Sequence, residues 1–166
     1  MSKIQLKKHL SSLDKSEIIE FVLEMYDVHK DYFEYYLKPD ERQQLEKYRK
    51  VIDREFHFMN GAQKFSVAKK AIADFTKLKP SEELIGELMM HLVKVGCKLT
   101  YDYGDYSENF YTALENNFDR ALKFIAKNGL LGLFKDDAEL CVKYASPCGY
   151  GFADTMRDIY GEYYAE

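Results

Sequence analysis

The sequence predicts an all-α fold of six to eight helices, packed as antiparallel hairpins and compatible with a short α-solenoid-like array. Two observations support this prediction. Apolar residues recur at spacings of three, four and seven in nearly every segment, which is typical of one buried helix face. Few segments show the alternation that indicates a strand. The 166 residues fit a single domain, 1–166, because no stretch rich in Pro, Gly or Ser interrupts them.

Three helices are expected in the N-terminal half. The first begins near Asp14, which has capping-box spacing to Glu17. The second follows Pro39, and the third ends before Lys79-Pro80, where a helix cannot continue. The residues that repeat at helical spacing are Ile18, Phe21, Val22 and Met25 in the first helix, Leu45, Tyr48, Ile52 and Phe56 in the second, and Phe65, Ala68, Ile72 and Phe75 in the third.

The next helix, at about residues 82–95, is apolar almost all round. A helix with so little polar face is usually central, so we expect it to be among the most buried elements. The following segment, 97–103, is compatible with a continued helix or with an extended chain. Three more helices are expected, one from Phe110 to Asn128-Gly129, one at about 136–145 and one from Phe152.

One weak internal similarity supports stacked hairpins. The segments "FSVAKKAIA" (65–73) and "FDRALKFIA" (118–126) share Phe, Ala, Lys, Ile and Ala at the same offsets. Repeated helical units of this kind are typical of proteins in which neighbouring hairpins bury one another's apolar faces.

The overall charge argues against nucleic acid as a partner. The net charge is −4 and the pI is about 5.7, with +3 in residues 1–80 and −7 in residues 81–166. The first ten residues lack the apolar run of a signal peptide, and the most apolar segment, 84–96, is too short and too charged to cross a membrane. Three cysteines without metal-ligand spacing predict reduced thiols without zinc, and a cytoplasmic location.

The stretch "YDYGDYSENFYTALENNF" (101–118) is the strongest candidate site. Its first expected role is a joint between two helices, in which Gly104 permits a turn and Asp105 or Ser107 caps the next helix. The neighbouring acidic and tyrosine side chains then form a contact surface for a protein or peptide, cationic or aromatic in character. The expected surface residues are Asp102, Tyr103, Asp105, Tyr106, Glu108, Tyr150 and Asp154.

A second interpretation makes the same stretch a metal site. Asp102, Asp105 and Glu108 have spacings of three, which on one helix would place three carboxylates within reach of one divalent cation. The protein would then be a small enzyme or a metal-dependent protein. The pattern does not fit an EF-hand loop, and a helix start explains the same residues.

Other candidate sites have simpler structural explanations. Cys148 precedes a helix and could act as a nucleophile, but no histidine lies near it in the sequence. The turn 149–151 could present backbone N–H groups to an anion, and because it follows no predicted strand it is not a dinucleotide-binding motif. His91 is expected to be a hydrogen-bonded core residue, and Arg49 to pair with Glu46 and Asp53. The usual catalytic signatures are absent, so we assign neither catalytic residues nor a cofactor.

Four motifs resemble an uncharacterised bacterial all-helical family that is catalogued as a domain of unknown function. They are "SK-x-x-LKK-x-L" at 2–10, "AKKAI-x-x-F" at 68–75, "YGD" at 103–105 with Phe110-Tyr111, and "G-x-GF" at 149–152. The resemblance implies one all-helical domain and supplies no activity. The sequence therefore favours a non-catalytic protein-interaction or scaffold module, and it leaves the oligomeric state open.

Overall fold

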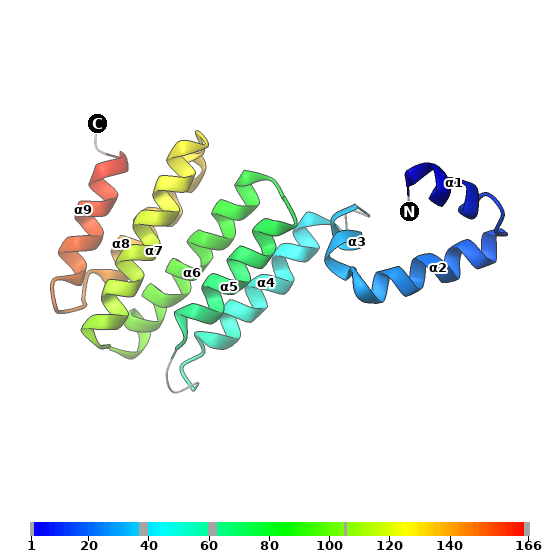
Figure 1. Ribbon diagram of the computed structural model, residues 1–166. Helices are drawn as coiled ribbons and strands as arrows, with labels where there is room; N and C mark the ends of the chain where they lie inside the picture. The colour runs from blue at the N-terminus through cyan, green and yellow to red at the C-terminus, as the bar shows by residue number, and fades with distance from the viewer. Residues whose placement is uncertain (1, 37–39, 60–62, 105, 165–166) are drawn as a thin grey trace. The chain divides into compact units, whose positions relative to one another are not determined.

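The structure is a computed structural model that describes residues 2–36, 40–59, 63–104 and 106–164 (Figure 1). These residues form nine α-helices and no strand, so the all-α prediction is confirmed. Two of the nine, at 3–10 and 30–36, were not expected, and the count of six to eight is therefore too low. Contacts divide the chain into unit 1, residues 1–39, and unit 2, residues 40–166. The single domain stays a prediction.

Unit 1 consists of three helices, which are α1 (Lys3–Leu10), α2 (Lys15–Val28) and α3 (Lys30–Tyr36). A capping box starts each of the first two. The Ser2 side chain accepts a hydrogen bond from the backbone N–H of Gln5, and Asp14 accepts one from Glu17, as the sequence predicts for Asp14. In both cases the side chain at the third helical position bonds back to the cap backbone. Local sequence thus defines where both helices begin.

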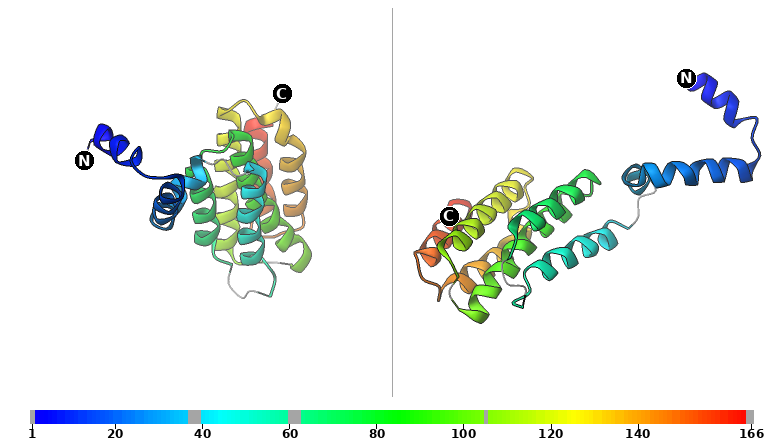
Figure 2. Two further views of the ribbon diagram at one scale, coloured as in Figure 1. Left: turned by 90° about the vertical axis from the view of Figure 1, so that its right-hand side faces the viewer. Right: turned by 60° about the horizontal axis from the view of Figure 1, so that its bottom comes forward.

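Unit 2 contains six helices arranged as three hairpins. These are α4 (Glu41–Glu55) with α5 (Phe65–Lys77), α6 (Glu82–Tyr103) with α7 (Glu108–Lys127), and α8 (Leu131–Ala145) with α9 (Phe152–Tyr164). The helices α4, α6 and α8 contact one another in that order, and α7 contacts α9 (Figures 1 and 2). Stacked antiparallel hairpins are the arrangement that the sequence predicts.

Successive hairpins of unit 2 point in the same direction. Arg42 at the start of α4 meets Glu83 at the start of α6, and further along Asp53 meets His91. The helices α4 and α6 are therefore parallel, with α5 returning between them. The two similar segments, 65–73 and 118–126, lie in α5 and α7, which are the second helices of successive hairpins.

Helix α6 is the centre of unit 2, as its apolar sequence predicts. It contacts α4, α5, α7 and α8, and eleven of its residues are buried. The approach to α7 is close because Gly96 lacks a side chain: a Cβ at this position would lie 2.3 Å from Cδ2 of Leu114. The segment 97–103 continues the helix, so of the two conformations that the sequence allowed the helical one is present.

The joint between α6 and α7 has the predicted construction. Gly104 follows the last residue of α6 with a φ of 91°, a backbone conformation that residues other than glycine rarely adopt. Ser107 caps α7, since its side chain accepts a hydrogen bond from the backbone N–H of Phe110 at 3.4 Å. Phe110 and Tyr111 then begin the buried stripe of α7.

Candidate functional site

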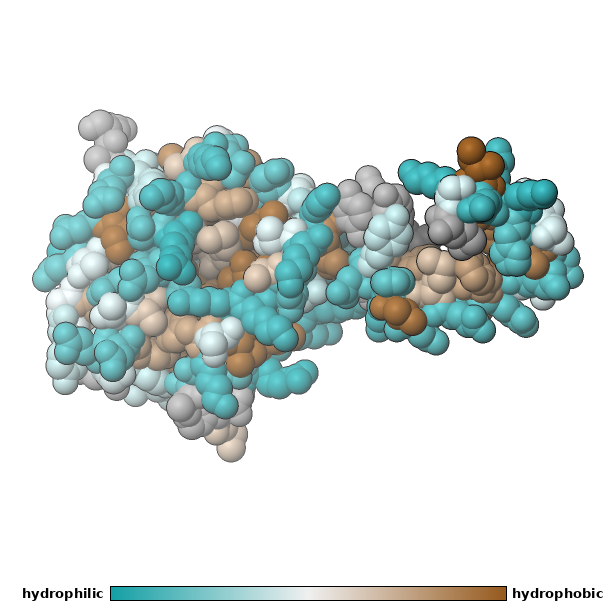
Figure 3. All heavy atoms as spheres, viewed as in Figure 1, coloured by the Kyte–Doolittle hydropathy of each residue, from teal (hydrophilic) through white to brown (hydrophobic). Residues whose placement is uncertain are grey.

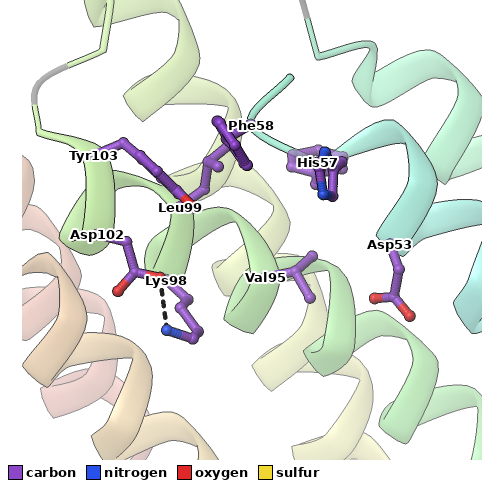
Figure 4. A pocket seen from close by; sticks show the side chains of 9 residues that line it. Asp53, His57, Phe58, Val95, Lys98, Leu99, Asp102 and Tyr103 are labelled. Carbon is purple, nitrogen blue, oxygen red and sulfur yellow. Dashed lines mark hydrogen bonds and ion pairs between the residues drawn. The ribbon is translucent and has the colours of Figure 1, made fainter. Parts of the chain in front are cut away.

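A pocket of about 240 Å³ lies between the end of α4 and the last three turns of α6 (Figure 4). It contains two of the residues singled out by the sequence, Asp102 and Tyr103, and brings them together with the segment that follows α4. The lining residues are Asp53, Phe56, His57, Phe58, Val95, Lys98, Leu99, Asp102 and Tyr103.

The apolar part of the pocket follows from helical geometry. Val95, Leu99 and Tyr103 are four residues apart, so α6 presents them on one face. At the outer end, the ring of Phe58 stacks on that of Tyr103, with centroids 4.7 Å apart and planes 13° apart. Tyr103 keeps 56% of its surface exposed. The pocket therefore has an aromatic rim that solvent can reach.

Asp53 supplies negative charge at the α4 side. Its Oδ1 lies 2.6 Å from Nε2 of His91, so Nε2 carries the proton and donates to the carboxylate. Burial lowers the pKa of His91, although Asp53 acts in the opposite direction. The imidazole is then mostly neutral at pH 7, and the charge of Asp53 is not cancelled by it. The prediction of a hydrogen-bonded His91 is confirmed.

Asp102 and Lys98 form an ion pair on the α6 side. Nζ of Lys98 lies 2.6 Å from Oδ2 of Asp102, one helical turn away. This hydrogen bond raises the pKa of Lys98. The pair is close to neutral as a unit, so the net charge along the pocket comes from Asp53. A pocket with a carboxylate at one end and an aromatic rim at the other is suited to a segment that carries guanidinium or ammonium groups.

Two arginines of α4 hold this helix against α6. The carboxylate of Glu87, whose side chain is 20% exposed, accepts from Arg42 at 2.7 Å and from Arg49 at 2.6 Å. Arg49 also binds Glu46, as predicted, but the predicted pair with Asp53 is wrong. Arg49 pairs with Glu87 instead, because this carboxylate on the neighbouring helix is more buried than that of Asp53. Asp53 pairs with His91. The arginine pairs hold together the two helices that line the pocket.

The structure places Tyr106 and Tyr150 around Tyr111 rather than in the pocket. The backbone N–H of Tyr106 donates to the hydroxyl of Tyr111 at 3.0 Å, and the ring of Tyr111 lies 6.2 Å from that of Tyr150. Tyr106 is half-buried, and burial raises its pKa, whereas Tyr150 is exposed. The two tyrosines thus form a second aromatic area beyond the joint.

The remaining predicted residues are separated. Glu108 lies in the first turn of α7, and exposed Asp154 pairs with Arg157 at 2.8 Å. Asp105 lies outside the described residues. Because Asp102 lies in the last turn of α6 and Glu108 begins α7, the idea that they share one helix face is wrong. Within the described part of the chain, no three His, Cys, Asp or Glu side chains are grouped as metal ligands.

The cysteines belong to the packing of unit 2. All three are free; Cys97 and Cys141 are buried, and burial raises the pKa of the Cys97 thiol. Sγ of Cys148, which is half-buried, lies 3.4 Å from Oγ1 of Thr100 on α6. A thiol bonded to a core threonine is a structural contact, and this geometry adds no support for a nucleophile.

The sequence did not identify the α4 side of the pocket. From the sequence, Asp53 is expected only as a partner of Arg49 on its own helix, and neither His57 nor Phe58 is among the predicted site residues. They lie about 40 positions before Val95 and Tyr103, so only the pairing of α4 with α6 brings them together. Phe58, three residues after the end of α4, is exposed, but this exposure is visible only in the structure.

These features define an all-α protein of stacked hairpins with an acidic, aromatic pocket. A family model described as a family of unknown function (DUF6155) matches residues 1–144, and the chain belongs to this family. The match includes the whole pocket, whereas Tyr150 and Asp154 lie beyond it. Comparisons with curated proteins and with solved structures give no match. No helix among the described residues is long and apolar enough to cross a membrane.

Proposed function

We propose that the protein is a non-catalytic interaction module that binds a cationic segment of a partner protein in the pocket between α4 and α6. The observation that supports this most directly is the combination of the Asp53 carboxylate with the exposed Phe58–Tyr103 stack. Asp53 meets α6 at His91, and Tyr103 lies twelve residues further along that helix, about 18 Å at 1.5 Å per residue. Two cationic side chains of one segment can therefore bind, one to the carboxylate through two hydrogen bonds and the other on the aromatic face.

The electrostatics of the pocket favour a cation over an anion. The His91 imidazole is mostly neutral and Lys98 is held by Asp102, so an entering cation meets one carboxylate without a competing free positive charge from these two residues. Residues 81–166, which supply α6, carry a net charge of −7, whereas residues 1–80, which supply α4, carry +3, so the attraction of a basic segment at a distance comes from the α6 side. We propose a cytoplasmic location because a reducing compartment keeps thiols such as the three free cysteines reduced.

A titration with a capped arginine tripeptide tests the proposal, with the citrulline tripeptide as a neutral control of the same shape. In NMR spectra of the full chain, we expect the arginine peptide to shift amide signals near 53–58 and 95–103. Binding should weaken as salt rises, because the attraction is partly between exposed charges. Equal shifts with both peptides would contradict charge recognition.

Variants then locate the site. We expect Asp53→Asn and Tyr103→Ala each to weaken the affinity for the arginine peptide about tenfold, which is the effect of one charged or aromatic contact of about 1.4 kcal/mol. Asp136→Asn removes an exposed carboxylate from α8 and should leave the affinity unchanged. Equal losses in all three variants would indicate a general effect of net charge and would reject the pocket.

A further inference from the structure

Helix α2 has an unusually broad apolar surface that its own unit does not bury. Eight of its fourteen residues are apolar, and at about 100° per residue they cover more than half of the helix circumference. Every residue of α1 and α2 is exposed or half-buried, and Figure 3 shows hydrophobic side chains at the surface of unit 1. The exposed apolar residues of α2 are Ile19, Val22, Leu23, Met25 and Val28.

The local sequence specifies α1 and α2 as helices even though little packing supports them. Both begin with a complete capping box, which satisfies backbone donors at the helix start. Isolated helices of up to about 12–15 residues are only marginally stable in water, so capping alone does not maintain them. An external surface that covers the apolar side of α2 would supply the missing stabilisation.

The charges of unit 1 indicate which partner covers the apolar side of α2. The helical segment 3–10 carries three lysines, at positions 3, 7 and 8, and no acidic residue. The helical segment 15–28 carries four acidic residues, at positions 17, 20, 24 and 27, and one lysine. A two-fold symmetric interface must be self-complementary, and a unit with one basic and one acidic helix meets this condition.

We propose that unit 1 is a dimerisation arm that pairs with unit 1 of a second copy of this chain. The apolar surfaces of the two α2 helices pack together, and α1 of each copy lies beside α2 of the other. The basic side chains of α1 then approach the acidic side of α2 twice, once in each half of the dimer. This surface is distinct from the pocket of unit 2.

Other occupants of the α2 surface fit less well. With a rise of 1.5 Å per residue, the 8 residues of α1 span about 12 Å and the 14 residues of α2 about 21 Å, so α1 of the same chain is too short to cover α2. An anionic membrane surface would repel the acidic polar side of α2, whereas helices that lie on such membranes carry Lys and Arg there.

The oligomeric state of the full chain tests this proposal. We expect light scattering after size-exclusion chromatography to show a dimer that dissociates on dilution over a hundredfold range of concentration. Leu23→Glu, at a residue 58% exposed within the chain, should weaken the dimer at least tenfold. Leu133→Glu, at an exposed residue of α8, is the matched control and should leave the dimer intact.

Charge exchange distinguishes a second copy from packing within one chain. We expect Lys7→Glu/Lys8→Glu and Glu20→Lys/Glu24→Lys to weaken self-association, each by about tenfold or more. An equimolar mixture of the two should form a heterodimer, because each α1 then faces an α2 of opposite charge. A wild-type chain that stays monomeric, a dimer unaffected by Leu23→Glu, or a mixture that stays monomeric would each overturn the proposal.

Discussion

Helices α2 and α7 begin from similar sequence features and reach different environments. Each has a side-chain cap at its start and an apolar stripe at helical spacing. Eight residues of α7 are buried, because α6, α8 and α9 surround it. The described residues of α2 include no buried one. A periodic stripe therefore specifies which face of a helix is apolar, and neighbouring elements decide whether that face is buried.

The difference has an energetic consequence. Full burial of a large apolar side chain contributes roughly 1.5–3 kcal/mol, so most of the stabilising burial of this chain lies in unit 2. Stability measured on the full chain should accordingly report on unit 2. Changes in unit 1 should have small effects on it, apart from effects that act through association.

The largest expected effect compares one phenylalanine from each unit. Phe118 of α7 is fully buried, and Phe118→Ala should lower the free energy of unfolding by about 3–5 kcal/mol, through lost burial and a cavity. Phe21 of α2 is half-buried, and Phe21→Ala should cost less than about 1 kcal/mol at a concentration low enough that the chain is monomeric. Urea unfolding followed by circular dichroism measures both. Similar losses would break the distinction between the units.

A smaller effect tests how tightly the helices of unit 2 approach. Gly96→Ala places a methyl group against Leu114 at the α6–α7 contact and should destabilise unit 2 by about 1–3 kcal/mol. Gly161→Ala in α9 meets open space and should instead stabilise by about 0.4–1 kcal/mol, because alanine is the better helix former. If Gly96→Ala also stabilised the protein, the close approach of α6 and α7 would be refuted.

The fold was largely predictable because its signals are local. Stripes at helical spacing identified seven helices, and the nearly all-apolar segment at 82–95 identified the central one. The misses have local causes as well. The basic segment 3–10 has a weak apolar pattern, and α3 is only seven residues long, so neither gave a clear stripe. The segment 97–103 carried both helical and alternating patterns, and packing on α7 and α8 favours the helix.

The candidate site was predictable only in part, because half of it depends on tertiary structure. Asp102 and Tyr103 are predicted as site residues because their segment is rich in acidic and tyrosine side chains, and both line the pocket. Asp53, however, was expected to pair along its own helix with Arg49. That expectation fails because α6 places His91 and Glu87 beside α4, and contacts between helices replace those within one helix.

The ion pairs between α4 and α6 allow a further test of the comparison, since they belong to unit 2. Glu87→Gln leaves Arg42 and Arg49 without their shared carboxylate and should cost about 1–2 kcal/mol, between the values for exposed and buried pairs. Glu83→Gln removes a longer, exposed contact of Arg42 at 3.5 Å and should cost less than about 0.5 kcal/mol. Urea midpoints compare the two, and equal shifts would show that Glu87 contributes no more than a surface charge.

The smallest expected effect is a dependence of stability on pH that arises in unit 2. Burial lowers the pKa of His91 below its ordinary value of 6.5 in the folded protein. As the pH falls through 6.5, the unfolded chain gains a proton that folded His91 does not bind, so the free energy of unfolding decreases until the pH reaches the folded pKa. One such group changes the free energy by at most about 1.4 kcal/mol per pH unit.

Replacement of single histidines assigns this dependence to its unit. His91→Gln keeps a donor that can reach Asp53 and lacks a titrating ring, so the loss of stability between pH 7.5 and 5.5 should become smaller than in the wild type. His29→Gln, at an exposed position in unit 1, should leave that loss unchanged. Urea unfolding at a series of pH values measures the slopes. If His29→Gln reduced the slope and His91→Gln did not, the lowered pKa of half-buried His91 would be contradicted. The idea that His91 leaves the charge of Asp53 in the pocket uncancelled would then fail as well.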